Sequence, residues 1–198
     1  MKSLTAALCL ALAPVMGAQA QSPRVDLSDV DRLQVLAGAS DVLARAPDVD
    51  VDRLFKAVHA ASRDEGEARG LCALFEPDAD RSLAGLQRAA NALGEQSRMR
   101  FIDAVSAVVV NGLQAPPRGY DPAVGEQALK AATVTGMMLH DGFLLGLSST
   151  GADAASRHAR CTAFRQMVDV LDGFGLAERV AATRYLLSEG LARYGGEL

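Results

Sequence analysis

Apolar residues recur at intervals of three and four along almost the whole chain, and this spacing restricts the possible fold more than any other feature. Such intervals place apolar side chains on one face of an α-helix. The strand-like triplet Val108–Val110 lies within a helical pattern over residues 95–113. We expect the inward positions of that helix to be Phe101, Ile102, Val105 and Val109. Glycines and prolines punctuate the pattern and delimit about seven or eight helices, so the sequence predicts an all-α fold.

The most apolar stretch after the N-terminus runs from Val134 to Leu147. We interpret it as the second half of a central helix that begins at residue 122 or 123 and ends near Leu147. Apolar residues surround almost its whole circumference, a pattern typical of a buried helix. His140 shares a stripe with Phe143, so we expect a buried histidine that has a hydrogen-bonding partner. Residues 21–198 are thus expected to form a single domain around this helix.

The first twenty residues carry the pattern of a secretory signal peptide. Lys2 provides a short positive region, residues 4–15 are apolar, and residues 18–20 read Ala-Gln-Ala, which matches an A-x-A cleavage site. The apolar run is too short to span a bilayer. Cleavage would leave Gln21 first. The excess of arginine over lysine is typical of GC-rich bacterial genomes, so we predict a periplasmic or secreted protein.

Two cysteines, Cys72 and Cys161, remain after removal of the signal peptide and its Cys9. In an oxidising compartment such a pair usually forms a disulfide. The two cysteines are 89 positions apart, and closing a loop of that size corresponds to about 4–5 kcal/mol of chain entropy. Two buried free thiols or an intermolecular bridge are the alternatives. The sequence holds no Cys-x-x-Cys motif, which argues against a catalytic dithiol.

The formal net charge of −4 becomes −5 when Lys2 leaves with the signal peptide. A mildly acidic balance argues against nucleic acid or an anionic membrane surface as the partner. No second apolar run approaches the length that a membrane span needs. We therefore predict a soluble product.

Residues 114–122 form the one long stretch in which prolines and a glycine oppose helix formation. Arg118 and Tyr120 lie near its middle. A stiff loop loses little entropy when it binds, and tyrosine and arginine are favoured at contact surfaces. We predict Arg118 and Tyr120 as binding residues. The alternative is a plain connector whose Tyr120 folds back onto the core.

The sequence contains none of the common catalytic motifs. Its three histidines do not form a His-Glu-x-x-His pair for zinc. The alternating aspartates of residues 48–52 resemble the start of a calcium loop, but Arg53 and His59 replace its glycine and glutamate. No Gly-x-Ser-x-Gly elbow and no phosphate-binding loop are present. We predict neither a bound metal nor a cofactor.

The pair His140-Asp141 is similar to the dipeptide that gives HD-class metal phosphohydrolases their name. That resemblance covers two residues. It would imply a metal site in this chain. The ligands would be His59, His140, Asp141 and either Asp169 or Asp172.

Together these features predict an exported, soluble and non-enzymatic periplasmic protein that binds another protein. Inhibitors and immunity proteins against cell-wall-attacking toxins have such properties. Two alternatives remain open: a helical enzyme that uses the region of His140 and Asp141, and a carrier of an apolar ligand near Met137 and Met138. The sequence leaves the oligomeric state open.

Overall fold

Most of the polypeptide beyond Arg32 folds into α-helices that are joined by short turns. The computed structural model describes residues 32–76, 78–80 and 83–196. These residues form one domain with nine helices and no strand, which confirms the all-α prediction. The predicted signal peptide, residues 1–20, lies outside the described residues.

The helices number nine in the described residues, and the single helix predicted over residues 122–147 is split in two. In chain order they are α1 (Arg32–Arg45), α2 (Asp48–Arg63), α3 (Glu65–Ala73), α4 (Leu83–Ala92), α5 (Glu95–Gln114), α6 (Pro122–Leu139), α7 (Phe143–Ser148), α8 (Ala154–Asp172) and α9 (Leu176–Gly196).

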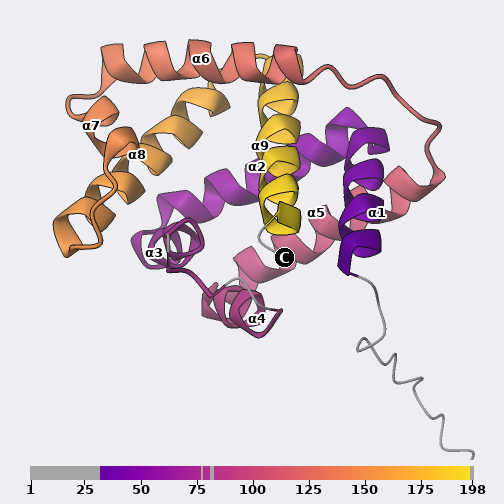
Figure 1. Ribbon diagram of the computed structural model, residues 1–198, viewed down its shortest axis with the longest axis horizontal. Coiled ribbons are helices and arrows are strands. Elements are labelled where there is room, and N and C mark those ends of the chain that lie inside the picture. The colour runs from indigo at the N-terminus through magenta and orange to yellow at the C-terminus, as the bar shows by residue number, and fades with distance from the viewer. Residues whose placement is uncertain (1–31, 77, 81–82, 197–198) are drawn as a thin grey trace, which may run out of the picture. The chain divides into compact units, whose positions relative to one another are not determined.

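Helices α2 and α9 lie at the centre of the domain (Figure 1). The first packs against α3, α5, α8 and α9, and the second against α1, α2 and α6. Both helices contribute to each of two apolar clusters. Phe55 and Ala182 belong to one cluster, whereas Val51 and Val180 belong to the other. The core therefore forms around α2 and α9, and the predicted central position of residues 122–147 is wrong.

Glycine allows several of the helices to approach one another closely. A methyl group on Gly112 of α5 would lie 2.5 Å from the carbonyl oxygen of Val42 in α1, and one on Gly125 of α6 would lie 2.5 Å from that of Ala181 in α9. Carbon and oxygen atoms that are not bonded cannot come so near, because van der Waals contact begins about 1 Å farther out. These contacts therefore require residues without a side chain.

Helix α5 has the predicted length but buries a different face from the one predicted. Its buried residues are Ser97, Ala104, Val108 and Gly112. Three positions that we expected to face inward are exposed: Ile102, Val105 and Val109. The physical reason is that α1 and α2 approach the small residues of α5, and the large apolar side chains remain outside this contact.

The predicted helix over residues 122–147 breaks after Leu139. Gly142 has φ +77° and precedes Phe143, the first residue of α7. The chain leaves α6 at His140, whose backbone is extended (φ −134°, ψ 116°). Gly142 then turns it into α7 in a left-handed conformation that glycine adopts without steric cost. The ring of Phe143 folds back over Gly136, where a methyl group would meet its ring carbons at 2.7 Å. Phe143 is thereby buried, with 1% of its surface exposed.

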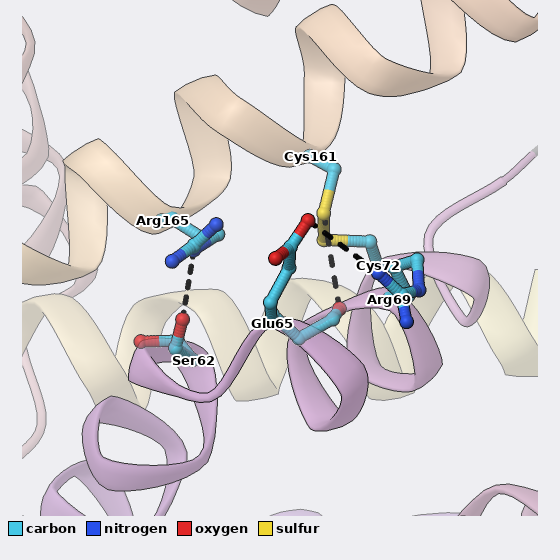
Figure 2. Close-up of a disulfide and its surroundings, with 7 residues drawn as sticks. Ser62, Glu65, Arg69, Cys72, Cys161 and Arg165 are labelled. Carbon is cyan, nitrogen blue, oxygen red and sulfur yellow. Dashed lines mark hydrogen bonds and ion pairs between the residues drawn. A yellow bond between two sulfur atoms is a disulfide. The ribbon is translucent and has the colours of Figure 1, made fainter.

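The two cysteines form the predicted intramolecular disulfide. The sulfur atoms of Cys72 and Cys161 are 2.10 Å apart, and the bridge joins α3 to α8. Figure 2 shows a second tie nearby, in which Arg165 of α8 donates from Nε to the carbonyl oxygen of Ser62 at 2.8 Å. The end of α2 and the whole of α3 are therefore fastened to α8. This pairing rules out the free-thiol and intermolecular alternatives.

Candidate functional site

Large apolar side chains face the solvent along the end of α6 and on α7. We call this group the α6–α7 surface. Its members are between 42% and 82% exposed, and the most exposed is Met138. They are Val134, Met137, Met138, Leu139, Leu144, Leu145 and Leu147. The prediction that this stretch is buried is therefore wrong.

The surface is exposed because α6 packs through its small residues. Its buried positions are Gly125, Ala128, Ala132 and Gly136, which recur every three or four residues on one side of the helix. That side contacts α8 and α9. A stripe of glycine and alanine brings the backbones close together, and the large side chains of α6 then lie outside the contact. The spacing of these four small residues is the sequence signal that could have indicated the buried side.

Helix α7 is held firmly although it has only six residues. Phe143 and Gly146 are its buried positions. A methyl group on Gly146 would lie 2.5 Å from the carbonyl oxygen of Ala159 in α8 and 2.7 Å from the Cβ atom of Ala163. The exposed leucines of α7 therefore stand on a backbone that α8 fixes in place.

The α6–α7 surface carries very little charge. Between Lys130 and Asp153 the sequence holds one fully charged residue, Asp141, beside His140. Asp141 is exposed and forms no ion pair with any residue that the structure describes. His140 follows the last residue of α6 and is partly exposed. The prediction of a buried His140 with a hydrogen-bonding partner is wrong, because the helix ends before it.

A shallow hollow of about 180 Å³ lies at the turn between α6 and α7. His140, Asp141 and Gly142 form its polar side, and Met137, Phe143, Leu144 and Leu145 its apolar side. Sites for small molecules typically enclose about 300–1,000 Å³. The hollow is thus smaller than an ordinary ligand pocket. Its size suits a single side chain of a neighbouring protein better than a lipid or a substrate.

The ligand set implied by the HD-class resemblance is not assembled. His59 of α2 contacts two carboxylates of α8, with Nε2 2.9 Å from Asp169 and Nδ1 3.3 Å from Asp172. The other two residues, His140 and Asp141, lie in the turn after α6. Among the described residues, no group of three or more histidine, cysteine, aspartate or glutamate side chains is arranged to hold a metal ion.

The carboxylates around His59 instead belong to a network of ion pairs between α2, α8 and α9. Lys56 pairs with Asp172, and Arg179 pairs with Asp52 at 2.6 Å. Burial by itself raises the pKa of Asp172, but the hydrogen bond from Lys56 and the charges of His59 and Arg179 outweigh it and lower the pKa. This network connects the helices that form the centre of the domain, so we interpret it as structural.

Arg118 and Tyr120, the predicted binding residues, lie between α5 and α6 and both contact the domain itself. The Nη1 atom of Arg118 is 3.6 Å from Oδ1 of Asp48. Burial raises the pKa of Tyr120, while the nearby hydroxyl of Ser188 in α9 lowers it in part. Tyr120 thus folds back onto α9, as the connector alternative expects. A role for these residues in binding stays a prediction.

No model of a known protein family matches this chain, and no curated protein and no solved structure matches it either. In the described part of the chain, no helix is long and apolar enough to cross a membrane. A functional proposal therefore depends on the sequence and on the geometry of the α6–α7 surface.

Proposed function

We propose that this chain is an exported protein that binds another protein through the α6–α7 surface and acts as an inhibitor or an immunity protein. The observation that carries the proposal is the exposure of seven large apolar side chains at the end of α6 and on α7. Soluble monomers rarely expose contiguous apolar patches of this kind unless they are interaction sites. Covering such a patch with a partner removes apolar surface from water, which favours association.

The chemistry of the surface favours a protein partner over a membrane. Helices that bind anionic lipid present lysine and arginine beside their apolar face. Here residues 131–152 contain no lysine or arginine, and Asp141 carries a negative charge. Methionine and leucine adapt well to protein grooves. The partner that fits is an apolar groove bordered by a basic group that can pair with Asp141.

The rigid placement of the surface also supports binding. Phe143 and Gly146 anchor α7 against α6 and α8, so the leucines are arranged before any partner arrives. Association then costs less conformational entropy than it would on a loop. By contrast, the hollow of about 180 Å³ is small for the apolar carrier that we considered as an alternative.

Two features support export. The pattern of residues 1–20 is that of a signal peptide, and Cys72 and Cys161 are joined. Structural disulfides persist in oxidising compartments and are rare in the cytosol. Protein that is purified from the producing bacterium should therefore begin at Gln21, which a measured mass would show. A mass that still includes the leader contradicts export.

Binding can be tested with a charged double variant, Met138→Lys with Leu145→Lys. The control is Leu186→Lys on α9, because Leu186 is an exposed leucine, at 50%, outside the α6–α7 surface. Wild type and control should retain the same partner from the bacterial envelope, and the double variant should lose it. With that partner purified, we expect the double variant to bind at least ~100-fold more weakly, as for the loss of two central apolar contacts.

The folding of each variant is checked by its helical circular dichroism and its melting temperature. Both should match the wild type, because substitutions at exposed positions change stability little. A double variant that folds normally and still binds with wild-type affinity contradicts the proposal. The proposal is also contradicted if the wild type retains no protein that the double variant fails to retain.

A further inference from the structure

The first half of α8, residues 154–162, contributes no buried residue to the core. The buried residues of α8 all lie beyond it, and they are Ala163, Val168, Val170 and Leu171. Helix α7 packs alongside the first half of α8 (Figure 1). The part of α7 beyond Phe143, which carries the exposed leucines, is therefore placed by whatever fastens this half of α8.

The disulfide fastens the first half of α8 to α3, as Figure 2 shows. Arg160 directly precedes Cys161 in α8. It forms an ion pair with Glu76, a buried residue that lies four positions after Cys72. The bridge thereby keeps the carboxylate of Glu76 within reach of Arg160.

Arg160 also connects this region to α7. Its Nη1 atom donates to the carbonyl oxygens of Ser149 and Gly151, at 3.2 and 2.7 Å. Both residues belong to the turn that follows α7, whose last residue is Ser148. A guanidinium donates its hydrogen bonds in a fixed fork, so the contact with Glu76 also orients the donors that hold the turn. The end of α7 thus depends, through Arg160, on where the bridge holds Glu76.

Ion pairs alone would hold the first half of α8 weakly. Arg157 pairs with Asp78 at 3.0 Å, but their side chains are 44% and 65% exposed, and exposed pairs contribute little stability. The side chains of Arg160 and Glu76 are 19% and 9% exposed. Desolvation offsets much of the attraction in a pair that is buried to this degree. The covalent bond is therefore the tie that decides where this half of α8 lies.

We propose that the disulfide between Cys72 and Cys161 is a redox switch for the α6–α7 surface. With the bridge formed, α7 and the first half of α8 are rigid, and the leucines of α7 are arranged for binding. With both thiols reduced, α7 loses its fixed position, while α2 and α9 stay folded around their apolar clusters. This inference rests on the binding function proposed above, because it concerns the regulation of the same surface. The chain then binds its partner fully only after it reaches an oxidising compartment.

An external disulfide, R–S–S–R, is the oxidant that forms the bridge. Cys161 is partly exposed and Cys72 is 7% exposed, so the exchange begins at Cys161. The thiolate of Cys161 attacks the external disulfide and releases one thiolate, RS⁻. The thiolate of Cys72 then attacks the Cys161 sulfur of the mixed disulfide and releases the second RS⁻. The two cysteine thiols lose two electrons and two protons, and the external disulfide becomes two thiols.

Backbone order parameters from nitrogen-15 NMR test the switch without a partner. In the oxidised wild type, residues 144–149 and 154–160 should be as rigid as α2 and α9, with values of about 0.85. In the variant Cys72→Ser with Cys161→Ser, both segments should fall below about 0.6, while α2 and α9 stay at about 0.85. Wild type that is kept reduced should behave like this variant.

The control for a general loss of stability is Arg184→Met. It retains the bridge and removes a side chain that is buried in α9, at the junction with α1 and α2. Its order parameters in α7 and α8 should equal those of the oxidised wild type.

The consequence for binding is measured with the partner that the oxidised wild type retains. The double serine variant should bind this partner at least ~10-fold more weakly, because association must then order α7 at a cost in conformational entropy. Arg184→Met should bind it with wild-type affinity.

Three results would overturn the switch. The first is a double serine variant whose α7 remains as ordered as in the oxidised wild type. The second is a loss of order in α2 and α9 together with α7, which would show that the bridge holds the whole domain. The third is equal affinity of the wild type and the double serine variant for the partner. Failure of the binding function is distinguishable, because the variant Met138→Lys with Leu145→Lys would then retain every protein that the oxidised wild type retains, whatever the order parameters are.

Discussion

Replacing Arg184 by methionine should destabilise the junction of α1, α2 and α9 strongly. The side chain of Arg184 is 7% exposed. Its guanidinium donates to the carbonyl oxygens of Leu43 and Ala46, at the end of α1, and to Asp48 Oδ1 at 2.9 Å. The last four carbonyls of a helix have no partner within it, and they form the negative end of the helix dipole. From inside the core, Arg184 provides hydrogen-bond donors for these carbonyls and a positive charge beside the negative end of the dipole.

The cost can be worked out from these contacts. Methionine keeps most of the aliphatic stem but donates no hydrogen bond, so two buried carbonyls lose their donor. Each unsatisfied group costs about 1–3 kcal/mol, which gives roughly 2–6 kcal/mol in all. Asp48 is 54% exposed and regains water, so losing its ion pair adds less than about 1 kcal/mol. A loss near 4 kcal/mol would lower the melting temperature by about 8–16 °C.

Urea unfolding at pH 7, followed by circular dichroism, measures this loss of free energy. The control is Asp48→Asn, which removes the charge that pairs with Arg184 and leaves the carbonyl contacts in place. We expect it to cost less than about 1 kcal/mol. The reasoning is refuted if Arg184→Met costs less than that amount, or if Asp48→Asn costs as much as Arg184→Met.

Two further predictions concern the disulfide and the acid stability of the domain. Replacing both Cys72 and Cys161 by serine should lower the free energy of unfolding by about 4 kcal/mol, because the bridge closes a loop across 89 positions; urea unfolding without reductant measures it, and a loss under about 1 kcal/mol would contradict the loop-closure argument. Asp172 has a lowered pKa in the folded protein, so its stabilising contribution is present above its unfolded pKa and is lost as the pH falls through its lower folded pKa. The variant Asp172→Asn should therefore lose less stability than the wild type below about pH 4. Thermal melts over an acid pH series would show this, and parallel curves for the two proteins would count against it.

Helix ends were predictable from the sequence because the signals that set them are local. Asp64 caps α3, Asp121 caps α6, and Asp153 caps α8, and each side chain accepts a hydrogen bond from a backbone N–H two or three residues later. Such bonds depend on the identity of one residue and its immediate neighbours. The break at Gly142 was missed, although glycine is a common helix stop. An apolar pattern that continued on both sides of it favoured an unbroken helix.

The candidate site was not predictable in the same way. The stretch from Val134 to Leu147 has the composition of a core helix, yet its large side chains face the solvent. In helix α5, too, the predicted inward face is exposed, since Val109 faces the solvent and Val108 is buried. A helical pattern indicates which residues share a face, but it does not indicate which face a neighbouring helix covers. The two predicted binding residues, Arg118 and Tyr120, instead contact Asp48 and α9.

The sequence by itself determined the helices, most of their ends and the pair of cysteines that join. Backbone hydrogen bonds and caps act over a few residues, and only two cysteines lie beyond residue 20. Only the tertiary structure decided which apolar faces are buried. That choice depends on how closely two backbones can approach, and they approach closely at Gly112, Gly125 and Gly146. Small residues form the contacts between these helices, and many of the large apolar residues remain exposed to the solvent.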